Sequence, residues 1–267
     1  MSRAARFAGP LAAATLGALL ARAARPALAT AIPRDILART NHTGHEVSLL
    51  EGPALVIAAG AAATLAGPGP SLSVLAAGAL GAVDDLAEDS THKGLKGHLG
   101  ALASGRLTTG SVKVLGLAAT GLAATRAIDG SKLTLGGAVL GTAIIAGAAN
   151  VANLLDLRPG RTLKSTLAVS IPLMLAGGSS ATAAAAAVGA AASLLPEDLA
   201  GETMLGDTGA NAAGALVGSA LVAGMSTRGR CITAAVLAGL TLASERVSFT
   251  TIIESTPGLR EVDAWGR

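Results

Sequence analysis

The chain has 267 residues, of which 51% are hydrophobic and only 14% are charged, and its formal net charge is +3. A soluble domain carries about 25% charged residues, so this chain has too few charges to cover a wet surface. Its basic residues are scattered and are not interleaved with aromatic side chains, which argues against nucleic-acid binding. The single cysteine, Cys231, excludes an internal disulfide. The composition therefore indicates an integral membrane protein.

Nine apolar stretches of helical length predict an all-α, polytopic bundle of transmembrane helices. We interpret the first stretch as a retained helix, because Arg22 and Arg25 follow its apolar run and no small-residue cleavage site separates them from the next loop. The sixth and seventh stretches are divided only by the sequence GGSS, so they could also form one broken helix. The predicted spans are 7–30, 52–67, 71–84, 110–126, 133–149, 165–178, 180–196, 209–226 and 231–249.

The connecting segments divide into two unequal sets. Of the 17 acidic residues, only Asp129 falls on one side of the predicted bundle, and most Lys and Arg residues lie with the other acids. The positive-inside rule makes this charged face cytoplasmic, so we expect a multi-pass protein of the cell membrane whose site faces the cytoplasm. The segments on the charged face are 31–51, 85–109, 150–164, 197–208 and 250–267.

The chain divides into a transmembrane domain, 1–249, and a tail, 250–267. The tail places Ile252, Leu259 and Trp265 among charges, which predicts an amphipathic segment on the cytoplasmic surface. A frayed terminus is the alternative.

The first acidic cluster, Asp84 and Asp85, ends the third predicted span. Adjacent carboxylates repel each other, and near a low dielectric they usually need a divalent cation, a basic partner or a shared proton. A solvated helix end is the alternative, and we prefer that interpretation for Glu88 and Asp89, which follow.

The second cluster places Asn150, Asn153 and Asp156 at a spacing of three, which puts them on one face of a helix. Amide and carboxylate groups there could ligate a cation or hold the edge of a sugar or base. Arg158 and Arg161 follow around a Pro-Gly turn and suit phosphate oxygens. The alternative is an ordinary helix end followed by basic anchors.

The third cluster is Asp207, which lies before the eighth span in the sequence MLGDTGAN. Asp207 could be a simple N-cap. However, Gly206 and Gly209 would let the backbone approach a ligand, and the helix would direct its positive end toward a phosphate. Between the first two clusters, Lys93 and Lys96 are candidate phosphate contacts or ordinary positive-inside residues.

These clusters, in this order, resemble the polyprenyl-phosphate N-acetylhexosamine-1-phosphate transferase family, which includes the phospho-N-acetylmuramoyl-pentapeptide transferases. GAVDD followed by KGL is similar to the Asp-Asp motif of the family, NVANLLD to its Asn-x-x-Asn-Leu-x-Asp motif, and MLGDTGAN to its Gly-Asp-x-Gly motif. The sequence RTNHTGHEVSLLEGPAL also resembles the loop between the first two helices of the family, so the resemblance covers roughly residues 34 to 215.

The resemblance implies transfer of a sugar-1-phosphate from a UDP-sugar to a polyprenyl phosphate, with release of UMP and with Mg²⁺ as the cofactor. It implies that Asp207, together with Asp156, ligates the metal, and that Asp84 and Asp85 bind or deprotonate the lipid phosphate. The nucleotide sugar would be held by Asn150, Asn153 and Asp156. The expected partners are the lipid phosphate, the nucleotide sugar and the bilayer. A homodimer is a further possibility.

Other functions remain in competition. After Asp156 the usual Gly-x-Asp-Gly of the family is replaced by Leu-Arg-Pro-Gly, and no His follows His98, so a non-catalytic relative that binds a lipid phosphate is one alternative. An ion-coupled transporter or channel is another, although its polar residues should not gather on one side. An aromatic-acceptor prenyltransferase would need a second Asp-rich repeat. A CDP-alcohol phosphatidyltransferase would need spaced Asp residues that this chain lacks.

Overall fold

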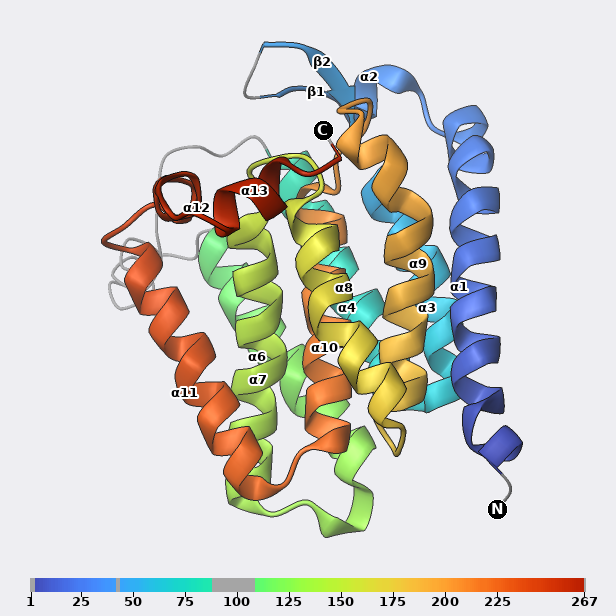
Figure 1. Ribbon diagram of the computed structural model, residues 1–267, viewed down its shortest axis with the longest axis vertical. Helices are drawn as coiled ribbons and strands as arrows, with labels where there is room; N and C mark the ends of the chain where they lie inside the picture. Colours follow the sequence, from blue (N-terminus) through green and yellow to red (C-terminus); the bar gives the residue numbers. More distant parts are fainter. Residues whose placement is uncertain (1–2, 42–43, 88–108, 267) are drawn as a thin grey trace.

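The computed structural model describes residues 3–41, 44–87 and 109–266, and most of these residues are helical (Figure 1). Each of the nine predicted apolar stretches lies mostly in a helix of its own, which agrees with an all-α architecture. These helices are α1 (Arg3–Ala31), α3 (Glu51–Ala63), α4 (Pro68–Leu86), α6 (Thr109–Asp129), α7 (Leu135–Leu155), α8 (Arg161–Ala176), α9 (Ala181–Leu199), α10 (Gly206–Gly224) and α11 (Thr227–Ser244). Short 3₁₀ turns, η1 (Thr64–Ala66) and η2 (Gly130–Lys132), follow α3 and α6.

Helices α8 and α9 pack side by side on either side of a tight turn, so the alternative of one broken helix is wrong (Figure 1). Gly177 and Gly178 have φ angles of 74° and 80° there. These angles lie in the left-handed region, which glycine adopts without a steric penalty.

Three helices in the described ranges are long and apolar enough to cross a membrane. They are Phe7–Ala31, Gly110–Lys132 and Leu135–Leu155. A fourth candidate is α11 taken together with α12 (Phe249–Ser255), although the two helices meet at an angle of 97°. Several of the remaining helices are rich in Ala and Gly, which contribute less hydropathy than Leu or Ile. The helices are therefore compatible with a membrane protein, and nine crossings stay a prediction.

Successive long helices run in opposite directions, so the ends of the bundle alternate along the chain (Figure 1). One end holds Asp84, Asp156 and Asp207, and we call it the acidic end. Among the described residues, Asp129 is the one acid at the other end, where it forms a bidentate ion pair with Arg230 over 2.6 and 2.7 Å. The predicted gathering of acids is present in the bundle.

Helix α10 lies at the centre of the bundle, and nearly all of its residues are buried. Its neighbours approach it backbone to backbone through small residues. A Cβ added to Gly81 of α4 would lie 2.2 Å from the carbonyl oxygen of Asp207, and one added to Gly214 would lie 2.3 Å from that of Ala148. The position of α10 along the bundle is thereby fixed.

A small hairpin covers part of the acidic end, where the sequence indicates only a loop. It follows α2 (Arg34–Leu37) and pairs β1 (Ala38–Thr40) with β2 (Glu46–Ser48) in antiparallel register. Three-residue strands are too short to give a recognisable alternation of polar and apolar residues. Backbone hydrogen bonds join Ser48 to Glu202 and Met204, so the hairpin is attached to the segment before α10.

The tail forms two short helices, α12 and α13 (Leu259–Ala264), which lie across the acidic end (Figure 1). It is therefore not a frayed terminus. Asp263 is buried against the bundle, whereas Trp265 is 69% exposed and Val262 62% exposed. The tail thus has a polar attachment to the protein and apolar side chains that face away from it.

Candidate functional site

Three helices bring charged groups together at the acidic end. Asp84, at the end of α4, and Asp207, in the first turn of α10, both form ion pairs with the ammonium group of Lys113 from α6. The Lys113 Nζ lies 3.0 Å from Asp84 Oδ2. The two predicted acids therefore meet, and Lys113 supplies the basic partner that adjacent carboxylates need. We call Asp84, Asp85, Lys113 and Asp207 the candidate site.

Asp85 holds the start of α10. Its carboxylate accepts hydrogen bonds from the backbone N–H groups of Asp207 and Thr208, each at 2.9 Å, and from the Thr208 hydroxyl at 2.6 Å. The Arg39 guanidinium donates to the Asp85 carbonyl oxygen at 2.5 Å. A carboxylate at a helix N-terminus satisfies unpaired amides and interacts favourably with the helix dipole. These contacts support a positioning role for Asp85.

Gly206 and Gly81 make this arrangement sterically possible. Gly206 has a φ of 59°, and a Cβ added to it would lie 3.0 Å from both carboxylate oxygens of Asp85. The sequence suggests that Gly206 lets a ligand approach the backbone. In the structure, a carboxylate of the same chain takes that place.

Asp156 belongs to a neighbouring pocket of about 190 Å³. The pocket lies between the hairpin, the turn from α7 to α8 and the segment after α9. Asp198, which is 4% exposed, and Arg158 line it together with Asp156. The carboxylate of Asp198 accepts a hydrogen bond from the Gly160 backbone N–H at 3.0 Å, which ties α9 to the turn before α8.

Asp156 lies just beyond the last residue of α7, and its surroundings disfavour its charge. Burial raises the pKa of Asp156 to about 8, and the negative charge of Asp198 contributes in the same direction. The Thr162 hydroxyl opposes this shift, whereas the charges of Asp207 and Asp85 add weakly to it. Asp156 is therefore close enough to the candidate site to sense its charges, and it holds a proton near neutral pH.

The two asparagines of the second cluster lie on α7 as predicted, but they do not line the pocket of about 190 Å³ among its described residues. Asn150 donates a hydrogen bond to the Thr241 hydroxyl of α11 at 3.1 Å. This contact turns Asn150 toward α11. The residues predicted to share one helix face therefore have different surroundings, since Asn150 contacts a neighbouring helix and Asp156 lines a pocket.

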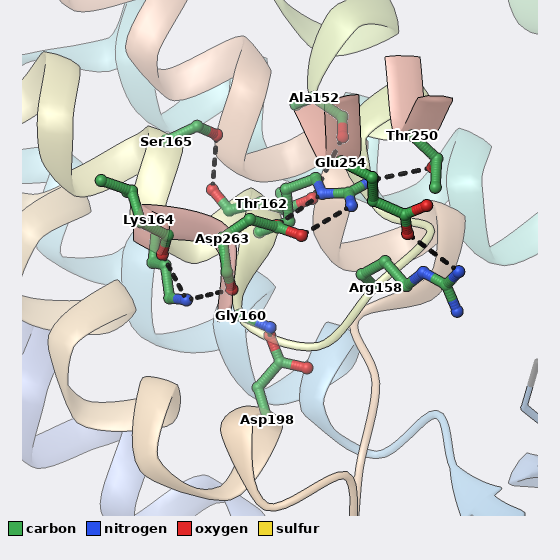
Figure 2. A network of polar contacts seen from close by, with 12 residues as sticks. Ala152, Arg158, Gly160, Thr162, Lys164, Ser165, Asp198, Thr250, Glu254 and Asp263 are labelled. Carbon is green, nitrogen blue, oxygen red and sulfur yellow. Dashed lines mark hydrogen bonds and ion pairs between the residues drawn. The ribbon is translucent and has the colours of Figure 1, made fainter. Parts of the chain in front are cut away.

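The tail engages the basic residues that the sequence suggests for phosphate (Figure 2). Arg161 is 5% exposed and forms a bidentate ion pair with Asp263, at 2.8 Å from Nε and 2.9 Å from Nη2. Its Nη1 donates to the Thr250 hydroxyl at 3.0 Å, while Arg158 contacts Glu254 at 3.2 Å. Phosphate binding by Arg161 would require release of the tail, whereas Arg158 is partly exposed and lines the pocket.

Sequence reasoning missed several residues of this region. Lys113 could have been found as a charge within the first turn of an otherwise apolar stretch, because ionisable residues in such segments commonly mark functional sites. No comparable signal distinguishes Asp198 or Arg39, whose importance arises from contacts distant in sequence. The candidate phosphate contacts Lys93 and Lys96 lie outside the described residues.

Asp84 and Asp207 are a pair of carboxylates of the kind that can hold a magnesium ion together with a substrate. Mg²⁺ is commonly bound by one or two carboxylates together with substrate phosphates and water. Asp84 and Asp207 supply two carboxylates that already share one cation, the Lys113 ammonium. Within the described ranges, no group of three or more His, Cys, Asp or Glu side chains could hold a metal by itself. Direct ligation by Asp156 stays a prediction.

Neither the models of known protein families nor the curated proteins match this sequence. Membership of the transferase family therefore stays a prediction from the three motifs. The acidic end provides a physical basis for a functional proposal.

Proposed function

We propose that this protein is a membrane transferase that moves a sugar-1-phosphate from a UDP-sugar to a polyprenyl phosphate and releases UMP, with Mg²⁺, in cell-envelope glycan synthesis. The meeting of Asp84 and Asp207 at one cation, from helices far apart in the chain, is the observation that supports it. Phosphoryl transfer depends mainly on neutralising charge and positioning the reacting groups. A pair of carboxylates and an ammonium group at one helix junction suits both tasks.

In this proposal, an oxygen of the lipid phosphate attacks the phosphorus next to the sugar. The bond from that phosphorus to the bridging oxygen breaks, and UMP leaves with the electron pair. Asp84 and Asp207 would hold Mg²⁺, and the bound ion would neutralise the charge of the diphosphate. Lys113 would then donate hydrogen bonds to phosphate oxygens. Asp85 is a positioning residue, because it fixes the first turn of α10 and therefore the position of Asp207.

The pocket beside Asp156 suits the nucleotide-sugar side of the reaction. A protonated Asp156 can donate a hydrogen bond to a carbonyl or hydroxyl oxygen, whereas the buried Asp198 accepts hydrogen bonds. Arg158 provides a cation at the same pocket for a phosphate. The polyprenyl chain would lie in the bilayer beside the bundle, with the acidic end at the cytoplasmic surface.

The experiment is a measurement of UMP release by purified protein with Mg²⁺, a polyprenyl phosphate and a panel of UDP-sugars. Asp84→Asn and Asp207→Asn should each lower the rate by about 100-fold or more, as expected when a group that stabilises developing charge is lost. Asp35→Asn is the matched control, because Asp35 is an exposed carboxylate in α2 at the same end of the bundle. Absence of UMP with every donor, or an equal loss in the control, would refute the proposal.

A non-catalytic protein that binds a lipid phosphate is the second candidate. The observation that favours it is that Lys113 already forms ion pairs with both Asp84 and Asp207. This alternative predicts that the polyprenyl phosphate binds with the same affinity with and without Mg²⁺, and that no UMP is released. Binding that strengthens with Mg²⁺ supports the transferase instead.

A further inference from the structure

A second, larger pocket of about 700 Å³ lies at the acidic end between α1, α2, α9 and the hairpin. Among the described residues, none of the four residues of the candidate site lines it. Its charged lining residues are Arg22, Arg25, Arg34, Glu46, Glu197 and Glu202. We call it the α1 pocket.

The α1 pocket begins where the close contact between α1 and α9 ends. Nearer the middle of the bundle, a Cβ added to Gly189 would lie 2.0 Å from the Ala14 carbonyl oxygen, and one added to Gly17 would lie 3.0 Å from that of Ala186. Toward the acidic end, Arg and Glu side chains and two prolines replace these small residues on both helices. Proline lacks a backbone N–H and disturbs the helix around it. Larger side chains thus take the place of the close backbone contact at this level.

The basic groups of the pocket come from α1 and α2. Arg22 and Arg34 are exposed, whereas Arg25 forms an ion pair with Glu197 of α9. The Arg25 Nε is buried and has no hydrogen-bond partner within the described part of the chain. Guanidinium groups match the geometry of phosphate oxygens, and a buried donor without a partner favours a ligand that supplies an acceptor.

The acidic groups belong to the other side of the pocket. Glu46 lies on β2, and Glu202 lies in the segment after α9 that is hydrogen bonded to the hairpin. Both side chains are exposed. Because the described lining of the pocket contains three arginines and three glutamates, a purely anionic headgroup would leave carboxylates facing it. A headgroup with both a phosphate and a hydrogen-bonding ammonium matches the two signs better.

The location also suits a lipid. Helix α1 is one of three helices in the described part of the chain that are long and apolar enough to span a membrane, and it exposes Leu11 and Leu19 at 66% and 60%. The pocket is at the C-terminal end of α1, where Arg22 and Arg25 lie, and basic side chains near the end of a membrane helix extend into the headgroup layer. Pro26, Ala29 and Ile32 provide apolar walls next to these charges. Acyl chains can therefore follow the apolar outer surface of α1.

We propose that the α1 pocket binds the headgroup of an ethanolamine phospholipid from the surrounding bilayer. The phosphate lies beside Arg22, Arg25 and Arg34, and the ammonium group lies beside Glu46 and Glu202. This site is separate from the candidate site and holds whether or not the protein is a transferase.

The experiment compares lipids that differ only in the headgroup. Purified, delipidated protein in detergent is titrated with phosphatidylethanolamine, phosphatidylcholine and phosphatidylglycerol of identical acyl chains, and binding is followed by native mass spectrometry and by thermal unfolding. We expect phosphatidylethanolamine to bind about 10-fold more tightly than the other two, which corresponds to about 1.4 kcal/mol. Phosphatidylcholine has the same charges but no N–H donor, so it isolates the contribution of the ammonium hydrogen bonds.

Two double variants separate the halves of the pocket. Arg22→Gln with Arg34→Gln should weaken all three lipids, and Glu46→Gln with Glu202→Gln should remove only the preference for ethanolamine. The matched controls are Arg228→Gln, which is exposed at the other end of the bundle, and Glu245→Gln, after α11. Thermal unfolding without lipid verifies that each variant is folded.

Three outcomes would overturn the proposal. One is equal affinity for all three lipids in the unmodified protein. Another is an arginine double variant that is folded and binds all three lipids normally. The third is soluble phosphoethanolamine that competes as strongly as the lipid itself, which would make the pocket a site for a free phosphate ester.

Discussion

The contact between α4 and α10 can be tested by adding one methyl group at Gly81. In Gly81→Ala, the new Cβ would lie 2.2 Å from the carbonyl oxygen of Asp207 and 2.6 Å from the Thr208 nitrogen. Favourable contacts between nonbonded heavy atoms lie near 3.5 Å, so the two helices must separate by about 1 Å. Both neighbouring atoms are backbone atoms, which cannot rotate away.

The expected cost has two parts. Overpacking of a close contact costs about 1–3 kcal/mol. The same separation would stretch the 2.9 Å hydrogen bonds from Asp207 and Thr208 to the Asp85 carboxylate, and hydrogen bonds to a charged group contribute about 1.5–3 kcal/mol each. The higher helix propensity of alanine offsets about 1 kcal/mol of this destabilisation. We expect a net loss of about 3 kcal/mol in the free energy of unfolding, because the bonds weaken rather than vanish.

Gly239→Ala in α11 is the matched control, since a Cβ there would meet nothing within 4 Å. It should leave stability unchanged or raise it by up to about 1 kcal/mol. Both variants are unfolded under the same detergent conditions, and UMP release is measured alongside. If Gly81→Ala unfolds at the same midpoint as Gly239→Ala, the close backbone contact between α4 and α10 does not exist, and the site geometry that depends on it is refuted.

Three further predictions concern the charged groups. Lys113→Met leaves two carboxylates without their shared cation, so Mg²⁺ should raise its unfolding midpoint more than that of the unmodified protein, and an equal Mg²⁺ response would contradict this. Because the pKa of Asp156 is raised in the folded state, folding retains a proton there and stability falls as pH rises from the ordinary Asp pKa near 4 to about 8. Asp156→Asn, measured in EDTA, should therefore gain stability relative to the unmodified protein across that window, and parallel pH profiles would refute the raised pKa. Arg161→Ala and Asp263→Ala should each reduce hydrogen-exchange protection of the tail by about 3–5 kcal/mol, and the double variant should lose little more than either single variant. Fully additive losses would mean that the two groups do not interact.

The sequence predicts the helices better than it predicts their contacts. Each apolar stretch forms a helix because its run of apolar and small residues continues until Gly, Pro or charges interrupt it, as at Gly177 and Gly178. Alternation of direction then follows from short connections, which is why Asp84 and Asp207 were expected at one end. The hairpin was missed because its strands are three residues long.

Side-chain partners depend on how each helix is rotated about its axis, and sequence spacing does not determine this. Asp84 and Asp85 are neighbours, yet one contacts Lys113 and the other holds the amides of α10. Close packing at Gly81 sets that rotation. The docking of Asp263 on Arg161 was likewise hidden, because the two residues are distant in the chain and the tail resembles an amphipathic surface segment.

The deep burial of α10 has a consequence for how such a protein can respond to a ligand. A helix surrounded by backbone contacts cannot slide or rotate without disturbing several neighbours at once, so α10 should stay in place when a ligand binds. Adjustment to molecules of different size must then come from the periphery, where the hairpin and the tail are attached by a few polar bonds. We therefore expect ligand specificity to be altered most readily by changes in these outer segments, with the reacting groups left in place.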